Sequence, residues 1–173
     1  MHKRPQRQIH VIDPENLGRN PRPTASEASS VRETYDSLVP FGTDDHVVVA
    51  FNHGGLFEFG SAWDPARLVV RSGKDGADLA LLQVLESEDV ADRFDGIVIG
   101  SGDGIFAEMA IGFREAGLEV TVVSEPEALS SRLARAADRI INFAPVPPTG
   151  PTLVPFPITV AAESGMVDLG RAA

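Results

Sequence analysis

Residues 96–106 read GIVIGSGDGIF: an apolar run, a glycine-rich loop that carries Asp103, and the beginning of an amphipathic segment. The run at 96–99 predicts a buried strand of a parallel sheet. Residues 105–116 predict a helix that ends at Gly117, because glycine readily adopts the left-handed conformation that closes a helix. A strand joined to a helix by a short loop is the unit from which parallel α/β sheets are built.

The same unit repeats in both directions from this stretch. Apolar runs predict further strands at residues 8–12, 46–51, 66–70 and 118–123, and a short last strand at 140–143. After the first of these strands, Pro14 is expected to stop the ladder and residues 16–18 to form a turn.

Helical patterns lie between the strands. The capping box of Thr24 and Glu27 predicts a helix that reaches Leu38, and residues 56–63, 78–90 and 129–137 predict three more. In the helix at 78–90, the spacing places Leu79, Leu82, Leu85 and Val90 on one face. We therefore predict a three-layer, Rossmann-like α/β domain around a central parallel sheet of about five strands.

The size and composition fit one such domain with a tail at each end. The chain has 173 residues, of which 43% are hydrophobic. We expect a basic N-terminal tail at 1–8, the domain at 9–143 and a proline-rich C-terminal tail at 144–173. The second tail is apolar enough to pack on a surface or to pair with the edge of a partner, in a homodimer or with another protein; disorder is the alternative.

The composition also excludes several kinds of site. The chain has no cysteine, which excludes disulfides, zinc–thiolate sites, iron–sulfur clusters and cysteine nucleophiles. No apolar run approaches the roughly 20 residues that cross a bilayer, and no long apolar stretch follows the basic residues 1–8 as it would in a secretory signal. We expect a cytoplasmic protein.

Three aspartates stand where the predicted topology gathers functional groups. Asp13 and Asp103 follow predicted strands, and Asp78 opens a predicted helix. Ligands of parallel sheets bind beyond the carboxyl ends of the strands, so we expect these carboxylates to share one pocket. Oxygen ligands suit a hard divalent cation such as Mg²⁺ or Mn²⁺.

The net charge of −10 argues against a protein that coats nucleic acid, because phosphate contacts need lysine and arginine. It does not exclude an enzyme that cuts nucleic acid at an acidic metal site, with a local basic rim for docking. Residues 1–7, Arg19 and Arg22 could form that rim, and Lys74 is a further candidate phosphate contact. The alternative is that these cations are ordinary solvated surface groups.

The segments around the aspartates resemble the NYN family of the PIN-like nuclease group. Residues 13–16 read Asp-Pro-Glu-Asn, similar to the D-x-x-N motif after the family's first strand. Residues 76–78 resemble its G-A-D motif, and residues 101–103 its S-G-D motif. The resemblance implies a PIN-like fold and a metal-dependent ribonuclease, and therefore RNA as a partner.

The resemblance also assigns roles. It implies that Asp13, Asp78 and Asp103 bind the metal, that Asn16 helps to orient the site, and that Ser101 is the serine of the third motif. The proposed chemistry is attack of an activated water on the phosphodiester.

One departure stands out. The family usually carries another aspartate two residues after Asp103, where this chain has Ile105. The site could use a single metal, recruit Glu15, Glu108 or Asp138, or have lost activity. A silent NYN-like module that binds RNA or protein is therefore the second hypothesis, and a phosphatase or nucleotide-binding domain the third.

Overall fold

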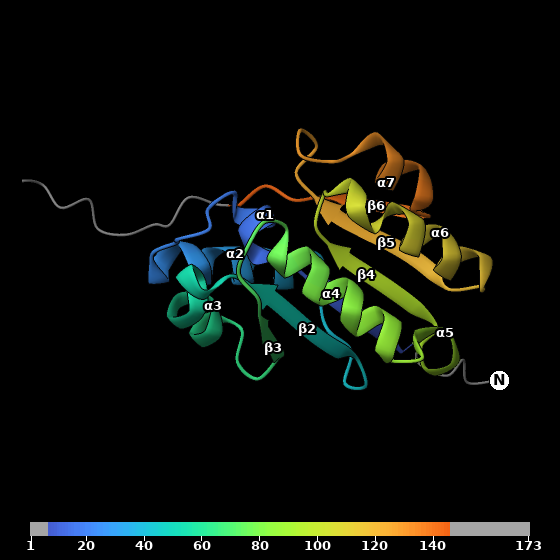
Figure 1. Cartoon of the computed structure of the whole chain (residues 1–173), viewed down its shortest axis with the longest axis horizontal. Coiled ribbons are helices and arrows are strands. Elements are labelled where there is room, and N and C mark those ends of the chain that lie inside the picture. The colour runs from blue at the N-terminus through green and yellow to red at the C-terminus, as the bar shows by residue number, and fades with distance from the viewer. Residues whose placement is uncertain (1–6, 146–173) are drawn as a thin grey trace, which may run out of the picture.

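The computed structural model describes residues 7–145, which form a six-stranded, all-parallel sheet in the order β3-β2-β1-β4-β5-β6 (Figure 1). The strands are β1 (Gln8–Ile12), β2 (His46–Phe51), β3 (Arg67–Val70), β4 (Gly96–Gly100), β5 (Glu119–Ser124) and β6 (Arg139–Asn142). The predicted α/β class and central parallel sheet are confirmed, and the short last strand becomes its sixth member.

Helices follow most of the strands. They are α1 (Pro14–Gly18), α2 (Ala25–Leu38), α3 (Leu56–Ala62), α4 (Gly76–Ser87), α5 (Val90–Arg93), α6 (Ala107–Glu115) and α7 (Ser131–Ala136), with 3-10 turns η1 (His53–Gly55) and η2 (Gly104–Phe106) before α3 and α6. The prediction of a turn after Asp13 is wrong. Pro14 instead begins α1, because the first residue of a helix needs no N–H partner.

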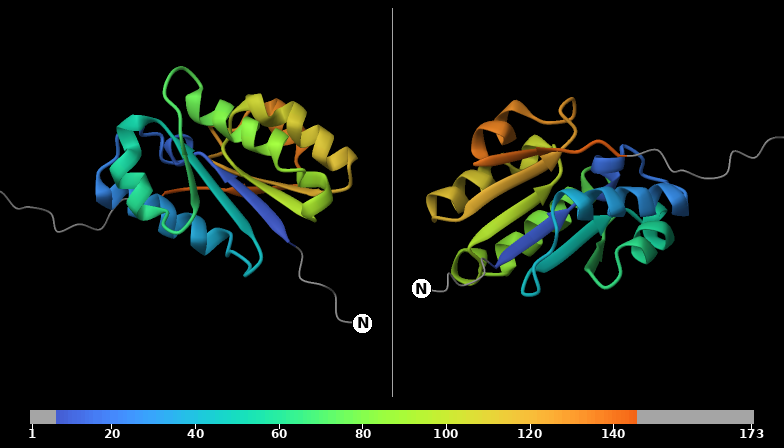
Figure 2. Two further views of the ribbon diagram at one scale, coloured as in Figure 1. Left: turned by 60° about the horizontal axis from the view of Figure 1, so that its bottom comes forward. Right: turned by 180° about the vertical axis from the view of Figure 1, so that it is seen from behind.

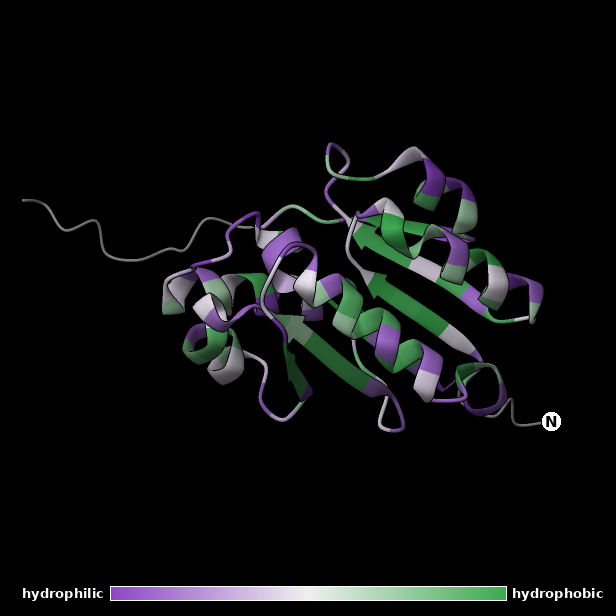
Figure 3. Ribbon diagram, viewed as in Figure 1, coloured by the Kyte–Doolittle hydropathy of each residue, from purple (hydrophilic) through white to green (hydrophobic). Residues whose placement is uncertain are grey.

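The helices cover both faces of the sheet, as Figure 2 shows from two further sides. One buried cluster joins α4, α6 and α7 to one face, and a second joins α1, α2 and α3 to the other. The strands are the most apolar part of the chain in Figure 3, as expected for a sheet buried on both sides.

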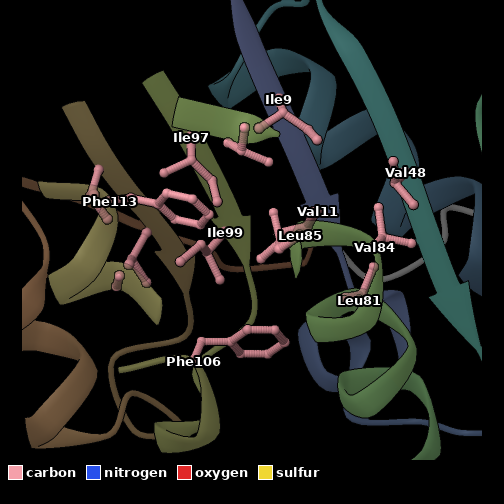
Figure 4. Close-up of a cluster of buried hydrophobic side chains, with 14 of the residues drawn as sticks. Ile9, Val11, Val48, Leu81, Val84, Leu85, Ile97, Ile99, Phe106 and Phe113 are labelled. Carbon is pink, nitrogen blue, oxygen red and sulfur yellow. The ribbon is translucent and has the colours of Figure 1, made fainter. Parts of the chain in front are cut away.

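The first cluster shows which face of α4 is buried (Figure 4). Leu81, Val84 and Leu85 lie against Val11 and neighbouring strand residues. Leu79 is 37% exposed, so its predicted place on the core face is wrong. A spacing of three residues drifts around a helix of 3.6 residues per turn, so the buried stripe passes through Leu81 rather than Leu79.

The buried polar residue His10 has a structural role. His10 is fully buried, and its ring nitrogens lie 3.0 Å from the Tyr35 hydroxyl and 3.3 Å from Asp45 Oδ2. Burial lowers the pKa of His10, so the neutral ring is favoured there. Among residues 7–145, none of the helices is long and apolar enough to cross a membrane.

Candidate functional site

The predicted site residues lie at the carboxyl ends of the two central strands. Ile12 ends β1 and is paired with Gly100, which ends β4, and the Asp13 N–H donates to the Gly100 carbonyl at 3.0 Å. The chain turns from β1 toward β2 and β3 on one side, and β4 returns on the other side of β1. This reversal is the kind of position at which open parallel sheets bind ligands.

Asp13 caps the short helix that follows it. Its Oδ1 accepts the N–H groups of Glu15 and Asn16, each at 2.9 Å, and the residue is 5% exposed. The carboxylate therefore satisfies the first amides of α1, as an N-cap does. Its place at the strand end and its burial follow from Ile12 and Pro14 on either side, both of which are buried.

Asp78 comes to the site from the first turn of α4. The residue is 7% exposed, and its Oδ1 is buried with no hydrogen-bond partner among the described residues. α4 can begin here because Gly76, its first residue, has no side chain and packs closely against the backbone of Arg71. A Cβ on Gly76 would lie 2.4 Å from the Arg71 carbonyl oxygen. An unpaired buried carboxylate oxygen is costly, and it is an unusual feature for a purely structural residue.

The two carboxyl groups perturb one another. Burial raises the pKa of Asp13 to about 8, and the charges of Asp78 and Glu15 add to the rise, while the two N–H groups oppose it. Burial also raises the pKa of Asp78 to about 6, and the charges of Asp103 and Asp75 add to the rise, while a side-chain hydrogen bond with Asp13 opposes it. Without a bound cation, the pair therefore tends to keep a proton near neutral pH.

Asp103 approaches the pair from the loop after β4. Its Oδ1 accepts the Ile105 N–H at 2.9 Å, and its own N–H donates to the buried Ser101 Oγ at 3.2 Å. Asp103 is near enough to Asp78 for its charge to raise the pKa of that residue. Ser101 thus shapes the loop, and Ile105 packs against the core where the family usually has an acidic residue.

Asn16 connects the first motif to the third. Its Oδ1 accepts the N–H of Gly102 at 3.0 Å. Gly102 is packed so tightly that a Cβ would lie 2.3 Å from Ser124 Oγ, so only glycine fits. The bond joins α1, which Asp13 caps, to the loop that carries Asp103.

We expect Asn16→Ala to lower the free energy of unfolding by about 1–2 kcal/mol, because it leaves the Gly102 amide without its partner. Urea denaturation at pH 7 measures this loss. Asn142→Ala, which alters an exposed asparagine of β6, is the matched control and should change stability by less than ~0.5 kcal/mol. Equal stability of Asn16→Ala and wild type would show that the bond does not hold the loop.

Of the three residues that could replace the missing acid, Glu15 lies with the cluster. Its two carboxylate oxygens accept the N–H and the side-chain Nδ2 of Asn52, both at 2.7 Å, and its charge reaches Asp13 and Asp78. Glu108 is exposed and pairs with Arg132, while Asp138 accepts the Val120 N–H near the opposite ends of the strands. The Glu15–Asn52 contact could not be found from sequence, because it joins α1 to the residue after β2, 37 positions away.

The donor set suits a hard divalent cation, although the site is not a closed chelate. Within residues 7–145, no three His, Asp or Glu side chains are grouped so that they could hold a metal ion as they stand. What the site offers is the buried pair Asp13 and Asp78, an unpaired oxygen, and Asp103 and Glu15 nearby. Mg²⁺ needs only a few carboxylates and retains several waters, so these residues fit it.

The predicted phosphate contacts differ in availability. Arg19 Nη1 lies 3.1 Å from Glu125 Oε2 in a partly exposed ion pair. Arg22 and Lys74 are exposed, and Lys74 belongs to the loop that leads into α4. Arg22 and Lys74 are therefore accessible to solvent without an ion pair among residues 7–145, whereas Arg19 is paired.

Comparison with known proteins adds a family and a fold. No curated protein matches the sequence. A solved structure of a protein of unknown function from Vibrio parahaemolyticus is similar, with a TM-score of 0.56 and 16% identity over 83% of this chain and 97% of that chain. At that identity the likeness concerns the fold alone.

The model of the NYN domain family matches residues 48–144. Asp78, Ser101 and Asp103 lie within the matched residues, while Asp13, directly after the central strand β1, and Asn16 of α1 precede them. The match covers more than half of the chain, and the protein belongs to the NYN domain family, a PIN-like family.

Proposed function

We propose that the protein is a divalent-metal-dependent endoribonuclease. The observation that carries the proposal is the buried Asp13–Asp78 pair with its unpaired Oδ1, at the sheet's switch point, in a chain of a PIN-like family. Burial of two carboxyl groups without a cationic partner is costly, and a bound divalent ion would offset that cost.

Asp13, Asp78 and Asp103 would hold Mg²⁺ or Mn²⁺, with Glu15 beside them. When bound, such an ion polarises the phosphoryl group and lowers the pKa of a coordinated water. The chain's own residues supply the frame: Asn16 holds the Asp103 loop, Ser101 shapes it, and the amides of α1 fix one oxygen of Asp13. Lys74 and Arg22 would contact phosphates of RNA at the rim of the site. Arg19 would also contact a phosphate while it keeps its ion pair with Glu125.

We also propose that residues 9–143 form the catalytic domain, because β1 supplies Asp13 and stands at the centre of the sheet. The basic residues 1–8 and the proline-rich residues 144–173 would be appendages, the second a candidate contact with a partner; most of both tails lies outside the described residues. A cytoplasmic location stays a prediction from the lack of cysteine.

The test is metal binding followed by cleavage. Mn²⁺ is expected to raise the melting temperature of wild type and to have little effect on Asp103→Asn. Labelled RNA should be cut by wild type with Mn²⁺ and left intact with EDTA. Cleavage that survives chelation would refute the metal-dependent mechanism.

Two observations favour the alternative of a silent NYN-like module. Ile105 stands in place of an expected acid, and no triple of ligands is formed within the described part of the chain. Binding of RNA or protein without metal-dependent cleavage would support that alternative.

A further inference from the structure

An exposed aromatic side chain lies near the site. Phe57, in the first turn of α3, is 82% exposed, whereas the other exposed large hydrophobic residues of the described chain are between 37% and 42% exposed. A single exposed apolar residue is common at protein surfaces and has no meaning by itself. The residues near Phe57 in the fold indicate a binding role for it.

The beginning of α3, from which Phe57 projects, lies near β3 and the loop after it. His53 lies one helical turn before Phe57, and its backbone N–H and ring Nδ1 lie 3.1 Å and 2.5 Å from the Ser72 Oγ. About one turn after Phe57, a Cβ on Gly60 would lie 3.7 Å from Leu68 of β3. The segment that leads into α3 is thus held to the loop of residues 71–75 through Ser72, and Phe57 projects into solvent from the next turn.

Three exposed cations belong to segments near the beginning of α3. The loop carries Arg71 and Lys74, both exposed, and Arg22 approaches from the other side, with its Cγ 3.4 Å from where a Cβ of Gly54 would be. None of these three has an ion pair among the described residues, although five other arginines do: Arg19, Arg32, Arg67, Arg93 and Arg132. Asp75 of the same loop and Glu58 next to Phe57 are the nearby acids in sequence, so these segments carry a small excess of positive charge in a chain of net charge −10.

This surface is joined to the carboxylates. Asn52 caps η1, which leads into α3, and its amide groups are held by Glu15, two residues after Asp13. The loop with Arg71 and Lys74 leads into α4, which carries Asp78. An RNA strand bound over Phe57 could therefore extend toward the Asp13–Asp78 pair.

We propose that Phe57 is a stacking site for an unpaired base of single-stranded RNA, with Arg22, Arg71 and Lys74 holding the phosphates beside that base; the proposal rests on the ribonuclease function proposed above. An aromatic ring stacks on any base, and cations at its sides track the backbone. Positive charge around the ring favours a polyanion over a protein surface. A paired base cannot stack in this way, so the surface selects unpaired nucleotides.

The experiment measures binding of a ten-nucleotide single-stranded RNA that contains 2-aminopurine, in EDTA, to the full chain. Phe57→Ala is expected to bind about tenfold more weakly and to lose the fluorescence change of the stacked base. Phe57→Trp should restore both. Ile140→Ala, which removes an exposed apolar side chain from the opposite edge strand β6, is the matched control and should bind as wild type does.

Failure of wild type to bind the RNA, or equal binding by Phe57→Ala, would overturn the stacking proposal. A change of oligomeric state in Phe57→Ala with unchanged RNA binding would overturn it too, because Phe57 would then be a protein contact. Phe57-dependent binding without Mn²⁺-dependent cleavage would leave the stacking site standing and remove the nuclease function. Mn²⁺-dependent cleavage by Phe57→Ala at the wild-type rate would support the nuclease function and overturn the stacking site.

Discussion

Asp13→Asn is expected to reduce Mn²⁺-dependent RNA cleavage by at least about 100- to 1000-fold, the scale of losing one main electrostatic group of a catalytic site. Asparagine keeps an Oδ1 that accepts the N–H groups of Glu15 and Asn16, so α1 keeps its cap. It removes the negative charge that would draw the cation to the buried pair. The measurement is the initial rate of cleavage of a fluorescent single-stranded RNA at saturating Mn²⁺.

Asp138→Asn is the matched control. Asp138 also accepts a backbone N–H, that of Val120 at 2.9 Å, but it does so near the other ends of the strands. This variant should cleave RNA at the wild-type rate. If Asp13→Asn cleaves as fast as the control, the charge of Asp13 has no part in catalysis and the proposed site is wrong.

Without metal, the contribution of Asp13 and Asp78 to the free energy of unfolding of wild type is expected to fall as the pH rises from about 4 to about 8. The folded pKa of Asp13, about 8, lies above its ordinary value of 3.8, and that of Asp78 is raised to about 6. The folded state therefore binds these protons more tightly than the unfolded state does. Their contribution to stability is complete below the ordinary pKa and is lost as the pH passes the folded pKa values.

The size of this effect can be bounded from Asp13. A rise from 3.8 to about 8 corresponds to at most ~6 kcal/mol. Relaxation around the ionised carboxylate reduces this, so we expect Asp13→Asn to exceed wild type by about 2–3 kcal/mol at pH 8.5 in EDTA, with a much smaller difference near pH 4. Urea denaturation in EDTA at several pH values measures both curves.

Adding Mn²⁺ and testing a control variant separate the effect of the Asp13 charge on stability from other effects of pH. Mn²⁺ should recover the stability that wild type loses at high pH and should do little for Asp13→Asn. Asp138→Asn should follow the wild-type pH curve. Parallel curves for wild type and Asp13→Asn would mean that burial does not hold Asp13 protonated and that the pair needs no cation to offset its charge.

Several features could be predicted because they depend on neighbours in sequence. The apolar runs of β2 and β4 and the capping box of α2 predicted their elements, and the capping box is present in the structure. The exposed Leu79 shows the limit. Which stripe of α4 is buried depends on the sheet beneath it, and Leu79 is as apolar as Leu81, which is buried.

The candidate site also has features that could be predicted from sequence and features that could not. Strand ends are local, so the sequence alone determined that Asp13 and Asp103 follow strands of a parallel sheet and that Asp78 opens a helix. Only the tertiary structure decided that Asp13 and Asp78 are desolvated together, that Glu15 is held by Asn52, and that Asn16 holds the Asp103 loop. Desolvation and long-range hydrogen bonds arise when separate segments pack together, and no local pattern in a chain encodes which oxygen will be left without a partner.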